Sequence, residues 1–292
     1  MTKVSIGLPV YNGEQFIRES IDSVLNQTFQ DFELIISDNA STDNTPTIVD
    51  PYVKRDSRLQ YYRNDKNFGA AYNYNRLVKM AQGEYFKWIS HDDVIAPTYL
   101  ERCVEILDHH DDVVLCYPKT VIIDEEGKKI SDHFDGLELT LCHCRSRFRK
   151  FLRKPAGCNP VFGLMRTKAL LSSSRIGSYA YSDYILLAEM CLKGKFWEIP
   201  ESLFFRRNHQ EMSRRKNRKG KELAFWFDTR RTTSNAFPLL KLLFELIKTV
   251  KNADISCNDK LLCYLVGLVC SPTLFFRTVD WWFARLDQSR MY

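Results

Sequence analysis

The chain lacks the features of a membrane-spanning or secreted protein. Residues 261–276 carry no charge, but Gly267 and Pro272 interrupt them, and the stretch is shorter than the ~20 apolar residues of a spanning helix. No signal-like segment precedes the first predicted strand, and the nine cysteines are scattered and odd in number. Cysteines used in this way are typical of a reducing compartment, so we expect a cytoplasmic protein.

Glycine-rich phosphate-binding turns are also absent. The first predicted strand, residues 3–8, runs into PVYNG at residues 9–13, which lacks the G-x-G-x-x-G of dinucleotide-binding dehydrogenases and the glycine-rich turn of sugar nucleotidyltransferases. The net charge is +6, but no recognised nucleic-acid-binding motif accompanies it. These absences disfavour a dehydrogenase and a nucleic-acid-binding protein, and they leave a sugar nucleotidyltransferase as the weaker enzyme alternative.

What the N-terminal half does contain is a regular alternation of strands and helices. The segment 14–27 has apolar residues on one helical face, and the segments between the predicted strands have helical patterns or helix-starting prolines. The predicted strands are residues 3–8, 32–38, 59–63 and 85–89. This spacing predicts an α/β fold with a mostly parallel sheet, right-handed crossovers and helices on its faces.

Two adjacent carboxylates, Asp92 and Asp93, follow the apolar strand 85–89. They therefore lie at the carboxyl end of a strand, which is where open α/β sheets bind ligands. Neighbouring carboxylates repel each other unless a positive charge lies between them, and Mg²⁺ or Mn²⁺ shared with substrate phosphates would supply it. The alternative is an acidic cap on the helix that Pro97 opens.

Four motifs occur in a fixed order and carry a family resemblance: PVYNG at 9–13, ISDNASTD at 36–43, NFG at 67–69 and HDD at 91–93. Together they resemble the nucleotide-sugar half of a family 2 glycosyltransferase with the GT-A fold, and the resemblance covers roughly residues 3–213. It implies a catalytic domain at 1–215, with a nucleotide-sugar half at 1–120 and an acceptor half at 121–215. Residues 216–292 would then form a helical C-terminal region.

The resemblance also implies a nucleotide site. A base-reading role for Asp38 would favour uracil or thymine, hence a UDP- or dTDP-sugar, because these bases carry an imide N–H. The alternative for Asp38 is an Asx-turn within its own loop. Tyr11 either stacks on the base or packs against the protein. The implied nucleotide-binding residues are Pro9, Tyr11, Asn12, Asp38, Asn67, Asp92 and Arg207.

The same resemblance makes Asp93 the direct metal ligand and Asp92 a residue that faces the ribose and the metal shell. His209 is either a neutral-imidazole ligand or a surface histidine. An arginine beside it would meet the diphosphate. Arg206 and Arg207 are both candidates, because adjacent strand residues face opposite ways.

Asp183 begins a predicted helix, residues 184–193, after a polar stretch. The resemblance implies that it is the catalytic base, although Ser182 stands where relatives usually carry glutamate. As base it would deprotonate an acceptor hydroxyl in a single displacement that inverts the anomeric carbon. The alternative is an N-cap aspartate.

The implied activity is thus metal-dependent, inverting transfer from a UDP- or dTDP-sugar to a glycan or lipid-linked acceptor, in cell-surface glycan or glycolipid synthesis. Processive relatives carry Gln-x-x-Arg-Trp, whereas Gln210 is followed here by EMSR, so we do not expect processive polymerisation. The non-enzyme alternative is a scaffold protein on a degenerate fold. Retention of all four candidate aspartates argues against that alternative.

The C-terminal region begins with a strongly apolar helix that Pro238 opens. Lys241, Glu245 and Lys248 fall on one narrow face, and interfacial aromatics follow at 281–283. Three interpretations stay open: peripheral contact with the inner membrane face, a homodimer contact, or packing on the catalytic domain. The basic run at 214–221 is expected to be a mobile loop. Most of its residues would form a solvated basic face, and one or two would close over the diphosphate or meet an anionic surface.

Overall fold

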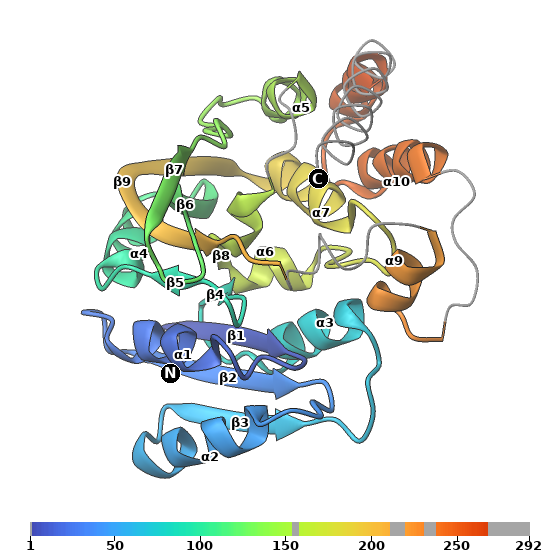
Figure 1. Ribbon diagram of the computed structural model, residues 1–292. Coiled ribbons are helices and arrows are strands. Elements are labelled where there is room, and N and C mark those ends of the chain that lie inside the picture. The colour runs from blue at the N-terminus through green and yellow to red at the C-terminus, as the bar shows by residue number, and fades with distance from the viewer. Residues whose placement is uncertain (1, 154–157, 211–219, 231–237, 268–292) are drawn as a thin grey trace.

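The computed structural model describes residues 2–153, 158–210, 220–230 and 238–267 (Figure 1). Its strands are β1 (Val4–Val10), β2 (Phe32–Asp38), β3 (Leu59–Arg63), β4 (Tyr85–Trp88), β5 (Val94–Ile95), β6 (Val113–Ile123), β7 (Lys129–His133), β8 (Leu164–Arg166) and β9 (Lys195–Arg207). These described strands form one sheet in the order β3-β2-β1-β4-β8-β6-β9-β5, with β7 paired to β6. The α/β fold with a mostly parallel sheet, predicted from the sequence, is confirmed.

The N-terminal part of the sheet is entirely parallel. β1 pairs with β2 and β4, and β2 pairs with β3, each in parallel. All of β1 is buried, as expected for a strand that helices cover on both faces. A Cβ at Gly7 would lie only 2.8 Å from the Phe86 ring and 3.0 Å from Leu77. Glycine therefore allows β4 and the helix that carries Leu77 to approach β1 closely.

Helices cover both faces of this sheet and enclose two hydrophobic cores. One core lies under α1, α2 and α4, and the other under α3, α5, α6, α7 and α10. The described helices are α1 (Ile17–Leu25), α2 (Thr45–Arg55), α3 (Ala70–Met80), α4 (Tyr99–His109), α5 (Cys144–Arg153), the 3₁₀ helix η1 (Asn159–Phe162), α6 (Thr167–Leu171), α7 (Ser182–Lys193), α9 (Gly220–Phe227) and α10 (Pro238–Asn252).

The second part of the sheet is mixed. β8 is antiparallel to both β4 and β6, whereas β6 and β9 run parallel. The sequence predicts only a short strand before Leu203, but β9 continues to Arg207. It carries register shifts against β6, so a single alternating pattern does not describe it. This extension brings the end of β9 level with the segment that follows β4, because β5 pairs with Phe204 and Phe205.

The C-terminal helices share the core of the catalytic body. Leu242, Leu246 and Val250 of α10 belong to the same buried cluster as α7, and Cys263 of the helical segment 257–267 joins them. The division predicted near residue 215 stays a prediction. In the part of the chain that the structure describes, no helix combines the length and apolarity needed to cross a bilayer. Most of the basic run at 214–221 and the aromatic segment at 281–283 lie outside the described residues.

Candidate functional site

Three loops meet at the carboxyl edge of the parallel strands. Val10 at the end of β1 stands opposite Asp38 at the end of β2, and the segment after β4 carries Asp92 and Asp93. A Cβ at Gly13 would lie 2.8 Å from the His91 ring, so the loops after β1 and β4 are in direct contact. The predicted nucleotide-sugar motifs therefore come together at one edge of the sheet.

The loop after β1 is held by the loop after β2. Asn12 has a left-handed backbone, with φ of 54°, and its Oδ1 accepts a hydrogen bond from the Thr42 amide at 2.8 Å. The Asn12 amide donates to the Ser41 hydroxyl at 2.9 Å. Tyr11 is exposed, which leaves its ring accessible to a ligand. Pro9 is buried inside β1 opposite Ser37 and supports the turn from within the sheet.

The Asp38 carboxylate is completely buried and bonded within the protein. Its Oδ1 accepts from the Ser41 amide at 2.8 Å and from the Ser41 hydroxyl at 2.6 Å. Its Oδ2 accepts from the Tyr61 hydroxyl at 2.6 Å and lies 3.4 Å from Arg63 Nε. In this conformation Asp38 organises the loop after β2, which is the alternative that the sequence left open. Its contact with a base stays a prediction.

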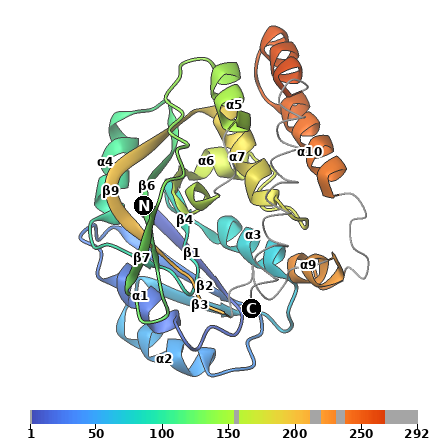
Figure 2. The same ribbon diagram turned by 45° about the horizontal axis from the view of Figure 1, so that its top comes forward.

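Asn67 is half-buried and bonds to a network that includes the buried Asn39 and Asn64, between β2 and α3. Its Oδ1 accepts from Asn39 Nδ2 and from the Gly69 amide, each at 2.8 Å. Asn39 Oδ1 in turn accepts from Asn64 Nδ2 at 2.9 Å. Thr229, just after α9, donates its hydroxyl to the Asn67 carbonyl at 2.8 Å. Figure 2 shows α9 beside α3, so the C-terminal region contacts the predicted nucleotide-binding loop.

Asp92 and Asp93 are adjacent carboxylates with opposite pKa shifts; Asp93 is buried, and the Asp92 side chain is 13% exposed. Asp92 Oδ2 lies 2.8 Å from His209 Nε2, and its Oδ1 accepts from the Ser90 hydroxyl. Burial alone would raise the pKa of Asp92, but the His209 hydrogen bond and the charge of His91 hold it below its usual range. Burial and then the neighbouring Asp92 charge raise the pKa of Asp93. One carboxylate is thus stabilised as an anion at the expense of the other.

His209 is buried against this pair, with its ring at 4.8 Å from the Phe16 ring in an edge-on arrangement. Because a carboxylate can only accept, Nε2 carries the proton that is shared with Asp92. Nδ1 is buried and has no hydrogen-bond partner within the described residues. An imidazole that donates one N–H to a carboxylate and keeps the other nitrogen unused has the arrangement of a typical metal-ligating histidine.

Arg207 faces away from the carboxylate side chains. Its Nε donates to the Asp92 carbonyl at 3.0 Å, and Nη1 donates to the carbonyls of Asp124 and Glu125. Its Nη2 pairs with Glu19 at 2.5 Å. The guanidinium is therefore committed to protein groups in this conformation, and its predicted contact with a diphosphate stays a prediction.

Arg206 points to the other side of β9. Its Nη1 donates to the Asn159 side-chain oxygen at 3.0 Å, and its positive charge lowers the pKa of Asp93 in opposition to burial and to Asp92. The Arg207 amide meanwhile donates to Asp93 Oδ1 at 3.0 Å. Of the two arginines, Arg206 thus places its charge nearer to the Asp93 carboxylate.

Asp183 is the second residue of α7, which starts after Tyr181 in a left-handed conformation. Its Oδ1 accepts from the Tyr184 amide at 2.9 Å. The N-cap position of α7 belongs to Tyr181 and no side chain caps this helix end, so the N-cap alternative for Asp183 is wrong and the catalytic base stays a prediction. Burial raises the pKa of the Tyr74 hydroxyl, and the charges of Asp92, Asp93 and Asp183 raise it further. The three carboxylates consequently lie within electrostatic reach of one phenol on α3.

The donor set fits a hard divalent cation. Asp93 and His209 offer an oxygen and a nitrogen, and the cation would offset the repulsion between Asp92 and Asp93. Among the described residues no three His, Cys, Asp or Glu side chains form a complete metal site. Mg²⁺ commonly takes only one or two carboxylates and completes its shell with substrate phosphates and water. The residues present therefore suit a cation that is shared with a bound diphosphate.

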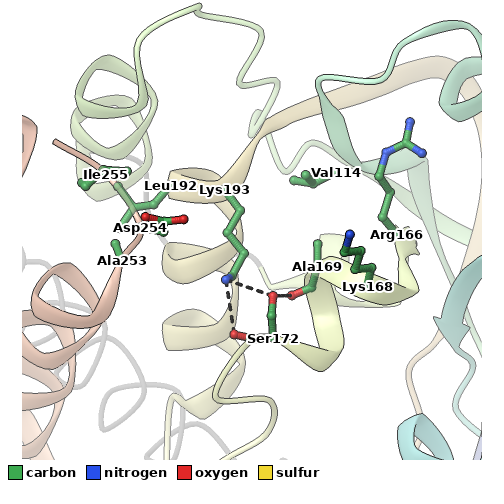
Figure 3. Close-up of a pocket in the computed structure, with 10 residues that line it drawn as sticks. All are labelled: Val114, Arg166, Lys168, Ala169, Ser172, Leu192, Lys193, Ala253, Asp254 and Ile255. Carbon is green, nitrogen blue, oxygen red and sulfur yellow. Dashed lines mark hydrogen bonds between the residues drawn. The ribbon is translucent and has the colours of Figure 1, made fainter.

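A separate cavity of about 340 Å³ lies between α6 and the ends of α7 and α10 (Figure 3). Two of its three cationic side chains, Lys193 and Arg166, are already bonded. Lys193 Nζ donates to the carbonyl and hydroxyl of Ser172, and Arg166 donates to the carbonyls of Leu107, Val113 and His110. None of the predicted site residues lines this cavity, so we do not place the nucleotide there.

Sequence reasoning missed several residues of the site. Tyr74, Glu19 and Phe16 appear only as helix residues in the sequence, and Asn159 as part of a loop. Glu19 and Arg207 are 188 residues apart in the chain, so no local pattern could pair them. The one available signal was the polarity of Asn73 and Asn75, which stand on either side of Tyr74 in the sequence of a helix that covers a sheet.

Comparisons with known proteins agree with this geometry. The family model for glycosyl transferase family 2 matches residues 5–174. An uncharacterized glycosyltransferase of Rickettsia conorii is 38% identical over 130 residues, which is 44% of this chain but only 21% of that protein. The match therefore spans about a fifth of the relative's length.

Two solved structures share the fold. S. aureus TarS 1-349, crystallised with UDP-GlcNAc, has a TM-score of 0.67 at 18% identity and covers 88% of this chain and 69% of its own. The mannosyltransferase PcManGT of Pyrobaculum calidifontis, in complex with GDP-Man and Mn²⁺, has a TM-score of 0.54 at 15% identity. The match covers 95% of this chain and 86% of the mannosyltransferase chain. The chain thus belongs to glycosyltransferase family 2 and has the GT-A fold.

Proposed function

We propose that the protein transfers a sugar from a nucleoside diphosphate to an acceptor hydroxyl, with inversion at the anomeric carbon and with the help of Mg²⁺ or Mn²⁺. The observation that carries this proposal is the Asp92–Asp93 pair at the carboxyl edge of the sheet, with His209 Nε2 at 2.8 Å from Asp92 and its Nδ1 buried without a partner among the described residues. Family membership supports it, as do relatives of the same fold that bind UDP-GlcNAc or UDP and, in one case, GDP-Man with Mn²⁺.

In this proposal Asp93 and His209 hold the cation, and Asp92 fixes the His209 ring through the 2.8 Å hydrogen bond. When bound, the cation supplies positive charge to the departing nucleoside diphosphate. Arg207 holds the end of β9 in place in two ways: its backbone amide donates a hydrogen bond to Asp93, and its guanidinium pairs with Glu19. This lock keeps the Asp93 carboxylate and the His209 ring in fixed positions before substrate arrives.

Asp183 is the proposed base. Its carboxylate takes the proton of the acceptor hydroxyl while that oxygen forms a bond to the anomeric carbon. The bond from the anomeric carbon to the diphosphate oxygen breaks in the same step, and the electron pair leaves with the diphosphate. Attack opposite to the leaving group inverts the anomeric configuration.

For the donor we propose a UDP- or dTDP-sugar, and for the acceptor a cell-surface glycan or a lipid-linked saccharide. Tyr11 is the exposed aromatic residue at the first turn and the candidate to contact the base. Asn12, Asp38 and Asn67 shape the surrounding loops through their side-chain hydrogen bonds. A location in the cytoplasm, including the inner membrane face, belongs to this proposal as well.

The test is nucleotide release from a panel of nucleotide sugars, including UDP-GlcNAc and GDP-mannose, in Mn²⁺ buffer. We expect the wild-type protein to release a nucleoside diphosphate from at least one donor. Asp183→Asn should slow this release by ~10²–10⁴-fold and leave donor binding nearly unchanged. Glu189→Gln, on the same helix but bonded to Ser174, is the matched control and should keep its rate.

Two outcomes would contradict the proposal. Release of a sugar 1-phosphate together with a nucleoside triphosphate when pyrophosphate is added would identify a nucleotidyltransferase, because the bond broken would then be the one between the two phosphates of the donor. Binding of no nucleotide at all, with or without Mn²⁺, would favour the scaffold alternative.

A further inference from the structure

We infer that the outer face of α10 docks the protein on an anionic lipid bilayer. This lipid-docking face is made of Leu240, Phe244 and Ile247, which are 62%, 61% and 47% exposed. They stand at positions i, i+4 and i+7 and so share one side of the helix. The opposite side is fully used, because Leu242, Leu246 and Val250 are buried in the core with α7.

The charges on α10 decide which partner fits this face. Lys248 and Lys251 continue the exposed side of the helix beyond Ile247. The single acid on α10, Glu245, is buried; it accepts a hydrogen bond from Lys241 at 2.6 Å and lies 3.9 Å from Nζ of Lys248, whose side chain stays 56% exposed. The outward side therefore shows apolar and cationic groups together, which suits the boundary between acyl chains and anionic headgroups. Two copies of this face would bring lysines against lysines, which disfavours a homodimer.

The position of α10 would bring a bilayer close to the proposed catalytic base on α7. This part of the inference rests on the proposed function. Lys241 Nζ lies 5.2 Å from the centre of the Tyr179 ring, and Tyr179 comes four residues before Asp183. Figure 2 shows α10 alongside α7 and at the side of the molecule away from β2 and β3. A bilayer at this face would lie near the end of α7 that carries the proposed base, as a lipid-linked acceptor requires.

The helical segment 257–267 extends the apolar surface. Leu261 and Leu265 are 60% and 50% exposed and lie one turn apart, while Cys263 between them is buried. Lys260 donates to the Lys251 carbonyl at 3.0 Å, which joins the segment to the end of α10. Exposed leucines on both helices are more than scattered surface residues and indicate an interaction surface.

The experiment is co-sedimentation of the full chain with vesicles of phosphatidylcholine alone or mixed with phosphatidylglycerol, at low and high salt. We expect binding to the mixed vesicles at low salt and much weaker binding to the neutral ones. The triple change Leu240→Gln, Phe244→Gln and Ile247→Gln should weaken binding at least ~10-fold. Lys248→Glu with Lys251→Glu should weaken it ~10-fold or more and remove its salt dependence.

Matched controls use exposed residues far from α10. Val53→Gln, Ile130→Gln and Phe134→Gln together remove other exposed apolar side chains, and Lys54→Glu with Lys128→Glu reverses two other exposed lysines. Both control variants should sediment like the wild type. Circular dichroism and UDP binding in Mn²⁺ buffer verify that each variant is folded.

Three results would overturn the inference. The wild type could ignore anionic vesicles at low salt, or the triple α10 variant could bind them as tightly as the wild type. Light scattering without lipid could instead show a dimer that the triple variant abolishes, which would identify a second copy as the occupant. Any of these results would reject the lipid-docking face. If the same protein still binds UDP normally, the proposed function is unaffected.

Discussion

Arg207 is a fully buried arginine whose role depends on its partners rather than on its charge alone. Its guanidinium joins Glu19 to the carbonyls of Asp92, Asp124 and Glu125, and lies over the Phe16 ring. It therefore ties the end of β9 to α1 and to the segment after β6. A group placed like this stabilises the site by holding segments together.

Arg207→Met should accordingly cost about 3 kcal/mol in the free energy of unfolding, because three carbonyls and a carboxylate lose their donor. The measurement is urea denaturation. Arg102→Met, which removes an exposed arginine paired with Glu201, should leave the midpoint almost unchanged. If Arg207→Met folds with normal stability and only loses UDP affinity, the diphosphate contact expected from the sequence is correct and the structural role is wrong.

Lys87 is a second buried cation, on β4, whose amine donates to the Trp88 carbonyl at 3.0 Å and lies 4.7 Å from the Tyr99 ring centre. Burial lowers the pKa of Lys87 from 10.5 to about 7. Between these two values the unfolded chain binds a proton that the folded protein does not. The lysine therefore favours unfolding at neutral pH, and this penalty disappears as the pH rises toward 10.5.

Lys87→Met lacks this penalty. Its gain in unfolding free energy over the wild type should therefore be larger near pH 7.5 than near pH 9.5. The difference in unfolding free energy between the two should shrink by about 1.4 kcal/mol per pH unit between about pH 7.5 and 9.5. Urea titrations of both proteins across this range measure it. A difference that stays constant with pH would show that Lys87 keeps its proton in the folded state.

At the scale of elements, the contact between α9 and the loop before α3 depends on Gly69. Its φ is +88°, and a Cβ there would lie 2.5 Å from the Phe227 carbonyl oxygen. Gly127 also has a positive φ, of +81°, but a Cβ there would meet nothing within 4 Å. A comparison of alanine substitutions at Gly69 and Gly127 therefore separates the cost of backbone strain from the cost of the collision with α9.

Gly69→Ala should cost at least ~2 kcal/mol more than Gly127→Ala, because only the first must push α9 away. It should also raise amide hydrogen exchange in residues 222–228. Urea denaturation and exchange mass spectrometry measure the two effects. Equal costs, with exchange in α9 unchanged, would mean that this contact is not maintained in solution.

The elements that the sequence predicted are those with local signals. Strands such as β2 and β3 begin and end as predicted, because apolar runs and the turns around them are written in consecutive residues. β7 was not predicted, since all its residues but His133 are exposed and it has no alternation of apolar side chains. The length of β9 also escaped, because pairing with β5 and β6 extends it.

Within the site, the sequence correctly predicted which segments meet but not how their side chains are used. Asp92, Asp93 and Asp183 all raise the pKa of the Tyr74 hydroxyl, so they lie within electrostatic reach of one residue, and their catalytic roles stay predictions. The commitment of Asp38 to Tyr61 and of Arg207 to Glu19 depends on partners distant in sequence. Side-chain direction on a strand is fixed by such partners, and no periodicity encodes them.

At the scale of the whole molecule, the C-terminal helices are part of the folded body. Leu242 on the inner side of α10 is 3% exposed and belongs to the core of α7, whereas Leu240 on the outer side is 62% exposed. Because the α7 core is shared, loss of α10 packing should weaken the whole catalytic body.

Leu242→Ala should lower the free energy of unfolding by about 2–4 kcal/mol, and Leu240→Ala by less than about 0.5 kcal/mol. Far-ultraviolet circular dichroism and tryptophan fluorescence should report one coincident transition for both variants. Two separate transitions, with Leu242→Ala moving only the weaker one, would show that residues 216–292 unfold as an independent unit.

The central claim is that the carboxyl edge of the parallel strands binds a nucleoside diphosphate with the help of a divalent cation. Calorimetric titration with UDP tests this claim most directly. UDP should bind at least ~10-fold more tightly in Mn²⁺ than in EDTA, because a cation held by Asp93 and His209 would supply positive charge to the phosphates. Asp93→Asn should remove that enhancement. Asp132→Asn, an exposed partner of Lys129, should keep it. Equal UDP affinities in Mn²⁺ and in EDTA for the wild-type protein would contradict the account.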